Sequence, residues 1–209
     1  MIRENGPCVI GLCGRSGAGK GMVCLAFRRL GVPSIDTDAV YRELTSGVGE
    51  CMTALRAGFG DEIVSPDGSL DRRALASIVF GNKRKLRKLG KITHPLILAE
   101  TERRVEKYRG ACDYVIVDAP VLFESGYDKK CDCIVAVDAP EEVLIKRITE
   151  RDGIDEEAAR SRLGSQKKLE KIKKKFDFTI INDEDLLSLD KKVEKTFSCI
   201  KAFCERASK

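Results

Sequence analysis

The chain has 209 residues, of which 43% are hydrophobic and 34% are charged, a balance that excludes a disordered chain and a membrane-embedded one. Its 38 basic and 33 acidic residues leave a net charge of only +5. The basic run at 167–175 has no interleaved aromatic residue, so we favour phosphate handling or plain solvation over nucleic-acid binding. No apolar run reaches the roughly 18 residues of a membrane span, and the N-terminus lacks a signal-peptide pattern. We therefore expect a cytoplasmic protein without a membrane partner.

Nine cysteines raise the question of disulfides or a zinc site. No C-x-x-C pair is present, and most of the cysteines stand among apolar residues, where a free thiol behaves as a small hydrophobic side chain. We therefore expect free thiols, as in a reducing compartment.

Short apolar stretches alternate with helical patterns along the chain. Five of them predict strands, at residues 8–13, 32–36, 114–118, 134–138 and 178–181. Gly31 supplies a helix stop before the second strand, and Asp138 offers an N-cap for the helix after the fourth. Strands separated by helices need parallel crossovers, so we predict an α/β fold with three layers around a five-stranded parallel sheet.

Two stretches interrupt this alternation. Residues 46–109 hold several helical patterns and no strong strand, and the stretch is too long for a simple connection. Residues 147–176 are highly charged, with Gly153 and Gly164 as candidate hinges. We interpret the first as a helical substrate-binding insertion and the second as a mobile lid, both within a single domain that spans 1–209.

Residues 14–20, Gly-Arg-Ser-Gly-Ala-Gly-Lys, match the G-x-x-x-x-G-K pattern of a phosphate-binding P-loop. They follow a predicted buried strand and precede a predicted helix, as the mechanism requires. Glycines such as Gly14, Gly17 and Gly19 let backbone N–H groups face phosphate oxygens, and Lys20 reaches the β- and γ-phosphates. The alternative is a glycine-rich turn without a ligand, but it explains neither the lysine nor the flanking elements. We therefore predict that the loop binds ATP.

The loop departs from the pattern at its end. The Ser or Thr that follows the lysine and binds Mg²⁺ is replaced by Gly21, and Met22 also lacks a hydroxyl. A bound Mg²⁺ ion must then be held mainly through water. These two residues keep open the alternative of a catalytically weak, nucleotide-binding regulator.

Carboxylates follow two of the predicted strands. Ligands bind at the carboxyl ends of parallel strands, so Asp36 and Asp38 are well placed to orient an attacking hydroxyl and accept its proton. One of them can instead cap the helix that begins near Ala39; we assign this structural role to Asp36 and the catalytic role to Asp38. Asp118 ends another strand and can hold Mg²⁺ through water, or serve as a turn carboxylate before Pro120.

The sequence resembles the dephospho-coenzyme A kinases over nearly the whole chain. Each matching segment is weak by itself, and their order and spacing carry the resemblance. The segments are residues 10–14, 30–38 with Arg42, 67–72, 78–80, 92–95, 118–126, 146–152, Arg162 with Gln166, and 181–182.

The resemblance implies ATP-dependent phosphorylation of the ribose 3′-hydroxyl of dephospho-coenzyme A, with Mg²⁺ as the accompanying ion. It matches Asp38 to the catalytic aspartate, Arg42 to a substrate-side arginine and Asn182 to a residue near the adenine. The ATP-phosphate segment comprises Gly17, Ala18, Gly19, Lys20, Gly21 and Met22. Another small-molecule or nucleotide P-loop kinase is the alternative within the same class, and the oligomeric state stays open.

We expect further substrate contacts from the turn at 120–126 and from His94, the only histidine. The resemblance makes this turn, with Phe123 and Glu124, a wall of the substrate crevice, although Leu122 and Phe123 can equally be ordinary core. Pro95 fits the first turn of a helix. We therefore place His94 at a helix start, in a hydrogen-bonding or substrate-contact role.

The predicted lid contains arginines at helical spacing. Lids of this kind bring planar bidentate donors onto the transferring phosphate, and we assign such a catalytic role to Arg147. Arg151 and Arg162 stay balanced between substrate contact and a salt-bridged surface helix, since acidic residues such as Asp152 lie near them.

Overall fold

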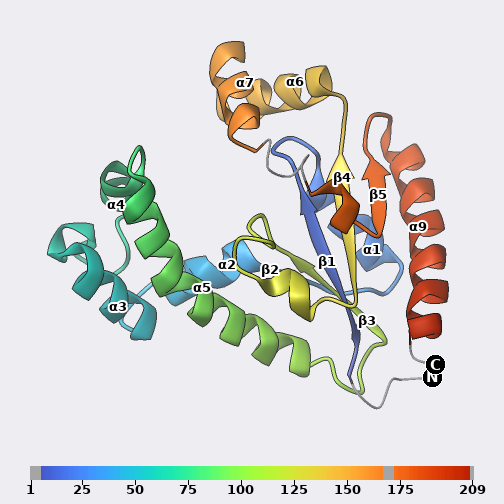
Figure 1. The fold of residues 1–209 in the computed structure, drawn as a ribbon, viewed down its shortest axis with the longest axis horizontal. Coiled ribbons are helices and arrows are strands. Elements are labelled where there is room, and N and C mark those ends of the chain that lie inside the picture. The colour runs from blue at the N-terminus through green and yellow to red at the C-terminus, as the bar shows by residue number, and fades with distance from the viewer. Residues whose placement is uncertain (1–5, 167–171, 208–209) are drawn as a thin grey trace. The chain divides into compact units, whose positions relative to one another are not determined.

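The computed structural model describes residues 6–166 and 172–207 (Figure 1). The chain separates into two compact units, the first formed by Met1–Ser34 with Tyr108–Lys209 and the second by Ile35–Lys107. The strands are β1 (Cys8–Gly14), β2 (Ser34–Asp36), β3 (Tyr114–Asp118), β4 (Cys133–Asp138) and β5 (Phe178–Ile181). The α-helices are α1 (Lys20–Arg29), α2 (Thr37–Leu44), α3 (Glu50–Phe59), α4 (Arg72–Val79), α5 (Lys83–Glu106), α6 (Glu141–Asp152), α7 (Glu156–Ser165) and α9 (Leu186–Ala207). The 3₁₀ helices are η1 (Asp61–Ile63), η2 (Tyr127–Lys130) and η3 (Lys173–Lys175).

The five strands form one sheet in the order β2-β3-β1-β4-β5, which places the first strand at its centre. β1 pairs in parallel with both neighbours, and Ile10 lies opposite Ile116 on one side and Cys133 on the other. β4 and β5 also pair in parallel. β1 is buried along residues 8–13, with both edges paired and both faces covered, which is why it is continuously apolar. The prediction of an α/β fold with a five-stranded parallel sheet is confirmed.

The main core of the first unit lies between the sheet and two helices, α1 and α9, which pack against each other (Figure 1). α9 presents buried residues at helical spacing, among them Val193 and Ile200. Phe197 of the same helix meets the ring of Phe27 edge-on at 5.8 Å and that of Tyr114 at 5.2 Å. All nine cysteines are free thiols.

Of the two helix-boundary signals predicted from the sequence, the helix stop at Gly31 is confirmed and the N-cap at Asp138 is not. α1 ends at the predicted glycine: Gly31 has a φ angle of 82°, and Val32 N–H donates to the Phe27 carbonyl at 3.0 Å. The prediction that Asp138 caps the helix after β4 is wrong, because the N-cap of α6 is Pro140 and has no side-chain cap. The Asp138 carboxylate instead accepts Arg15 Nε at 2.8 Å. Among the described residues, no helix is both long and apolar enough to cross a membrane.

The second unit is built from α2 to α5 around its own apolar core. Cys51 and Leu55 of α3, Ile63, and Leu75 and Val79 of α4 are buried there. Its one isolated β-bridge among the described residues joins Val64 and Leu70. The helical character predicted for 46–109 is present, and its role as a substrate insertion stays a prediction.

The predicted helix start at His94 is wrong, since α5 runs without a break from Lys83 to Glu106 with Pro95 inside it. The start signal is Asn82, whose Oδ1 accepts the N–H groups of Arg84 and Lys85 at 3.0 Å. Pro95 removes one helical hydrogen bond, but α5 packs against α2, α3 and α4, and this burial maintains the helix.

Candidate active site

The loop between β1 and α1 has the shape of an anion cradle. Gly17 and Gly19 adopt positive φ angles of 78° and 85°, and Ala18 N–H closes a turn on the Arg15 carbonyl at 3.1 Å. α1 then begins at Lys20. The N–H groups of a helix's first turn have no acceptor inside the helix and carry the positive end of its dipole. A phosphate group fits this position.

Lys20 stands at the carboxyl end of the sheet, with its Nζ 3.5 Å from the Gly14 carbonyl oxygen. Burial raises the pKa of the Cys13 thiol at the end of β1 to about 12. Lys20 opposes this shift, whereas Asp118 and Glu124 add to it. The charges of three predicted site residues, Lys20, Asp118 and Glu124, therefore all affect the pKa of this one buried thiol.

Asp118 ends β3 opposite Leu12 of β1. Its Oδ1 atom is buried, and Oδ2 accepts the Cys24 thiol of α1 at 3.8 Å. Within the described part of the chain, no cluster of three or more His, Cys, Asp or Glu side chains can hold a metal ion. Mg²⁺ usually keeps several waters and needs one or two carboxylates beside the phosphates. A single carboxylate at this edge fits that requirement, and its metal role stays a prediction.

Arg147 and Asn182 hold the glycine loop from the side of α6 and β5. Arg147 Nη1 donates to the Asn182 carbonyl oxygen at 2.9 Å and to the Gly17 carbonyl oxygen at 3.4 Å. Asn182 is buried and donates from Nδ2 to the Ala18 carbonyl oxygen at 2.9 Å. Both residues therefore shape the loop, while the predicted contacts of Arg147 with the transferring phosphate and of Asn182 with the adenine stay predictions.

Two more contacts on the loop were not predicted from the sequence. Arg15 donates from Nε to Asp138 Oδ1 at 2.8 Å and from Nη2 to the Ala139 carbonyl oxygen at 3.0 Å. Ser16 and Gln166, which follows α7, exchange two hydrogen bonds at 2.9 and 3.1 Å. Residues 15 to 18 are thus each held by a side chain from a different later segment. Arg15 and Ser16 occupy variable positions of the G-x-x-x-x-G-K pattern, so the pattern does not predict which residues contact them.

The arginines at 151 and 162 make salt bridges in this structure. Arg162 forms an ion pair with Asp152 of α6, and Arg151 donates from Nε to the same carboxylate at 2.8 Å. These contacts agree with the alternative that both arginines belong to a salt-bridged surface helix. Substrate contact by Arg162 stays a prediction. Residues 167–171 of the predicted lid lie outside the described residues.

The turn at 120–126 follows β3. Leu122 is fully buried and belongs to the core. Phe123 is half-buried: its ring centroid lies 5.9 Å from that of Phe176, and Lys175 Nζ stands 5.4 Å from it. Glu124 is exposed. Substrate contacts by Phe123 and Glu124 stay predictions.

Asp36, at the end of β2, and Asp38, in α2, belong to the second unit and have different surroundings. Asp36 is the N-cap of α2, and its Oδ1 accepts the N–H groups of Asp38 at 2.8 Å and Ala39 at 3.1 Å. Its Oδ2 accepts Arg42 Nη2 at 3.3 Å. Asp36 therefore has the capping role that we assigned to it. Asp38 is exposed in the first turn of α2, and the catalytic role of Asp38 and the substrate contact of Arg42 stay predictions.

His94 lies inside α5, and its half-buried imidazole packs over Gly90, one turn earlier. A Cβ atom on Gly90 would approach the ring to 3.1 Å. The absence of a side chain at Gly90 makes room for the imidazole. Substrate contact by His94 stays a prediction.

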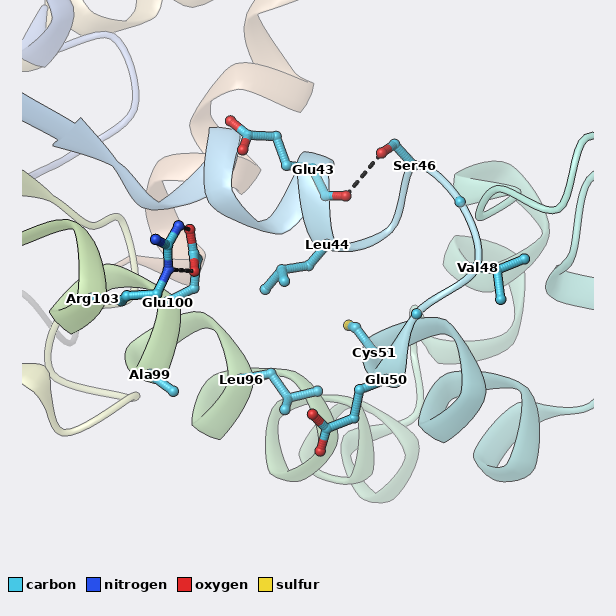
Figure 2. Close-up of a pocket in the computed structure, with 12 residues that line it drawn as sticks. Glu43, Leu44, Ser46, Val48, Glu50, Cys51, Leu96, Ala99, Glu100 and Arg103 are labelled. Carbon is cyan, nitrogen blue, oxygen red and sulfur yellow. Dashed lines mark hydrogen bonds and ion pairs between the residues drawn. The ribbon is translucent and has the colours of Figure 1, made fainter.

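The second unit also contains a pocket of about 470 Å³ between the end of α2, the following loop, the start of α3 and α5. Figure 2 shows its apolar side, formed by Leu44, Cys51, Leu96 and Ala99 among others. Arg103 at its edge donates from Nε to Glu100 at 2.7 Å. The lining residues are Glu43, Leu44, Ser46, Gly47, Val48, Gly49, Glu50, Cys51, Leu96, Ala99, Glu100 and Arg103.

Comparison with known proteins shows the family to which this chain belongs. The model of the dephospho-CoA kinase family matches residues 8–188. This chain belongs to the dephospho-CoA kinase family. A dephospho-CoA kinase of Nitrosospira multiformis is 36% identical to it over 186 residues, which cover 88% of this chain and 92% of that protein.

Solved structures agree with membership of the dephospho-CoA kinase family. TT1252 from Thermus thermophilus is 27% identical with a TM-score of 0.78, covering 94% of this chain and 97% of that one. A dephospho-CoA kinase from Campylobacter jejuni is 25% identical with a TM-score of 0.61, covering 93% and 97%. A kinase family implies ATP as the phosphoryl donor, which suits the loop that ends in Lys20.

Proposed function

We propose that this protein transfers the γ-phosphoryl group of ATP to the ribose 3′-hydroxyl of dephospho-coenzyme A, giving coenzyme A and ADP. The observation that carries the proposal is the glycine loop with Lys20 between β1 and α1, in a chain that matches the dephospho-CoA kinase family over residues 8–188. A cytoplasmic location, as predicted from the sequence, belongs to the same proposal.

The donor phosphates bind to the loop and to the first turn of α1. Lys20 neutralises charge on the β- and γ-phosphates, and the N–H groups of the loop supply fixed donors. Phosphoryl transfer is promoted mainly by positioning and by electrostatic stabilisation. The contacts that Arg147 and Asn182 make with Gly17 and Ala18 support this role, because they fix the loop before any ligand arrives.

Asp38 serves as the base for the acceptor. Its carboxylate orients the 3′-hydroxyl and takes its proton as the oxygen attacks phosphorus. Asp36 supports this role because it already caps α2 and binds the Asp38 N–H, which fixes the backbone from which Asp38 extends.

Mg²⁺ is proposed to be held by Asp118 through water, since Gly21 and Met22 have no hydroxyl to offer. When bound to ATP, the ion neutralises charge on the phosphates. Asp118 would orient the water molecules of such an ion. Lys20 stabilises the phosphates independently of the ion.

The pocket in the second unit suits the uncharged pantetheine arm of the acceptor. Its apolar side chains, such as Leu44 and Leu96, can cover an aliphatic chain, whereas Glu43, Glu50 and Glu100 disfavour a diphosphate there. We expect an acceptor shortened to its nucleotide portion to show a higher KM with the full-length protein. An equal KM for the two acceptors would refute this assignment of the pocket.

A coupled ADP-release assay tests the function. Dephospho-coenzyme A should support turnover, nucleoside monophosphates should not, and Lys20→Ala should abolish most of the activity while the protein stays folded. Turnover with a monophosphate instead would identify another nucleotide kinase. Tight ATP binding without transfer to any acceptor would favour the catalytically weak regulator that Gly21 and Met22 suggest.

A further inference from the structure

Gln166 is joined to the glycine loop by two complementary hydrogen bonds. The Ser16 N–H donates to Gln166 Oε1 at 2.9 Å, and Gln166 Nε2 donates to Ser16 Oγ at 3.1 Å. A backbone N–H can only donate, so the amide oxygen must face it, and the amide nitrogen is left for the hydroxyl. One side chain therefore holds both the backbone and the side chain of a single loop residue.

Gln166 is also the C-cap of α7, so this contact joins a whole helix to the loop. The N-cap of α7 is Asp155, whose carboxylate accepts the Ala158 N–H at 2.7 Å. It buries Ala159 and Leu163 in the core of the first unit. Its C-terminal end meets the loop through Gln166, and Arg162 lies one turn earlier on the same helix.

The ion pair of Arg162, one turn before Gln166, is a weaker contact. Arg162 pairs with Asp152, but 44% of the arginine side chain and 23% of the aspartate side chain are exposed. Exposed ion pairs contribute little and are screened by salt. The hydrogen bonds of Gln166 are half-buried, so together with the buried Leu163 they hold the end of α7 against the loop.

We propose that Gln166 is a positioning residue for phosphoryl transfer. It aligns Ser16 and the neighbouring loop N–H groups with the donor phosphates and sets the distance of Arg162 from them. Misplacement of donors by a fraction of their hydrogen-bond length lowers transfer more than it lowers ground-state binding. This inference rests on the proposed kinase function.

The test compares Gln166→Ala, Ser16→Ala and the double variant with Ser165→Ala as the matched control. Ser165 is the exposed neighbour on α7, and among the described residues its hydroxyl donates within that helix, to the Arg162 carbonyl. Gln166→Ala should lower kcat by about tenfold or more while the KM for ATP changes by less than about threefold. ADP release without acceptor should rise relative to transfer, because an undocked helix admits water.

The double variant measures the coupling directly. Ser16→Ala removes only the hydroxyl, so its effect should be smaller in the Gln166→Ala background than in the wild type. Gln166→Glu keeps an acceptor for the Ser16 N–H but adds negative charge beside the phosphates, and it should weaken ATP binding where Gln166→Ala does not. The Ser165→Ala control should match the wild type.

Three results would overturn the proposal. They are a kcat for Gln166→Ala within about twofold of wild type, a loss explained entirely by a smaller folded fraction, and strictly additive effects in the double variant. If the wild-type protein transfers no phosphate to dephospho-coenzyme A, the proposed function itself fails. If the wild type is active and Gln166→Ala is equally active, only the role of Gln166 is refuted.

Discussion

Asn182 closes the space beside Gly19: a Cβ atom on Gly19 would lie 2.3 Å from the side-chain amide nitrogen of Asn182. The amide cannot simply turn away, since it is buried and donates to the Ala18 carbonyl at 2.9 Å. Gly19 also has a φ angle of 85°, which L-residues with a side chain rarely adopt. Conformation and space thus exclude a side chain at the same position.

Gly19→Ala should lower both stability and ATP affinity. The left-handed conformation costs an alanine about 1 kcal/mol, and a displaced Asn182 loses a hydrogen bond that contributes about 1 kcal/mol. Urea denaturation and calorimetric ATP titration measure the two effects. Gly21→Ala is the matched control, because a Cβ there meets nothing within 4 Å. Equal behaviour of the two variants would contradict this account of Gly19.

Arg147→Ala should reduce transfer by about ten- to a hundredfold and ATP affinity by less. The guanidinium holds the carbonyl oxygens of Gly17 and Asn182, and the sequence predicts that it also contacts the transferring phosphate. Steady-state kinetics and ATP titration separate the two effects. Lys146→Ala is the control, since its side chain is 76% exposed on the same helix. A change in melting temperature alone, with a normal kcat, would mean that Arg147 has a structural role and no catalytic one.

Asp38→Asn should lower transfer by about 10²–10⁴-fold, as expected for loss of a general base. Asp36→Asn should leave stability nearly unchanged, because asparagine caps a helix as well as aspartate does, whereas Asp36→Ala should cost about 1 kcal/mol. The exposed Arg42 pair adds little to this. Transfer rates and denaturation curves for the three variants decide the assignment. Loss of transfer in Asp36→Asn with a normal Asp38→Asn would reverse the two roles.

Gly21→Ser should strengthen the dependence of ATP binding on Mg²⁺. Serine restores the hydroxyl that usually binds the ion, and the structure has room for it because nothing lies within 4 Å of a Cβ at Gly21. Calorimetric titration of ATP at several Mg²⁺ concentrations measures the effect, with Gly21→Ala as the reference. Identical curves for serine and alanine would mean that the ion is placed elsewhere.

Ionisation of the Cys13 thiol in the unfolded chain should lower the free energy of unfolding at alkaline pH. Burial raises the pKa of this thiol from 9.0 to about 12. Below pH 9 both states keep the proton. As the pH rises from 9 towards 12, the unfolded chain loses it first, so the free energy of unfolding falls. Between about pH 8 and pH 10 the fall in Cys13→Ala should be about 1 kcal/mol smaller than in the wild type. Parallel falls in the two proteins would contradict the burial of this thiol.

Local patterns in the sequence predicted the sheet and the glycine loop well. Apolar strands next to helices, and a glycine pattern that ends in Lys20, express interactions between neighbours along the chain. The helix start at Asn82 was overlooked because Pro95 is a stronger local signal, and tertiary packing of α5 overrides it. The capping prediction for Asp138 failed for a similar reason, since its partner Arg15 lies far away in the sequence.

The supports of the loop were the least predictable part of the site. Gln166 and Arg147 contact Ser16 and Gly17 across long sequence separations. Neither pair follows a spacing rule, and their contacts exist only because α6 and α7 return to the carboxyl end of the sheet. The roles of Asp38, Arg42 and His94 in the second unit stay predictions.

The central position of β1 has a consequence for the way this protein is made. The ribosome delivers Cys8–Gly14 early, yet the partners of this strand are Tyr114–Asp118 and Cys133–Asp138. β1 therefore emerges with both edges unpaired and cannot enter the sheet until residues 114–138 have followed. Exposed strand edges of this kind promote aggregation. A nascent chain stalled before residue 114 should accordingly depend on chaperones, whereas one extended past residue 138 contains both strands that pair with the edges of β1.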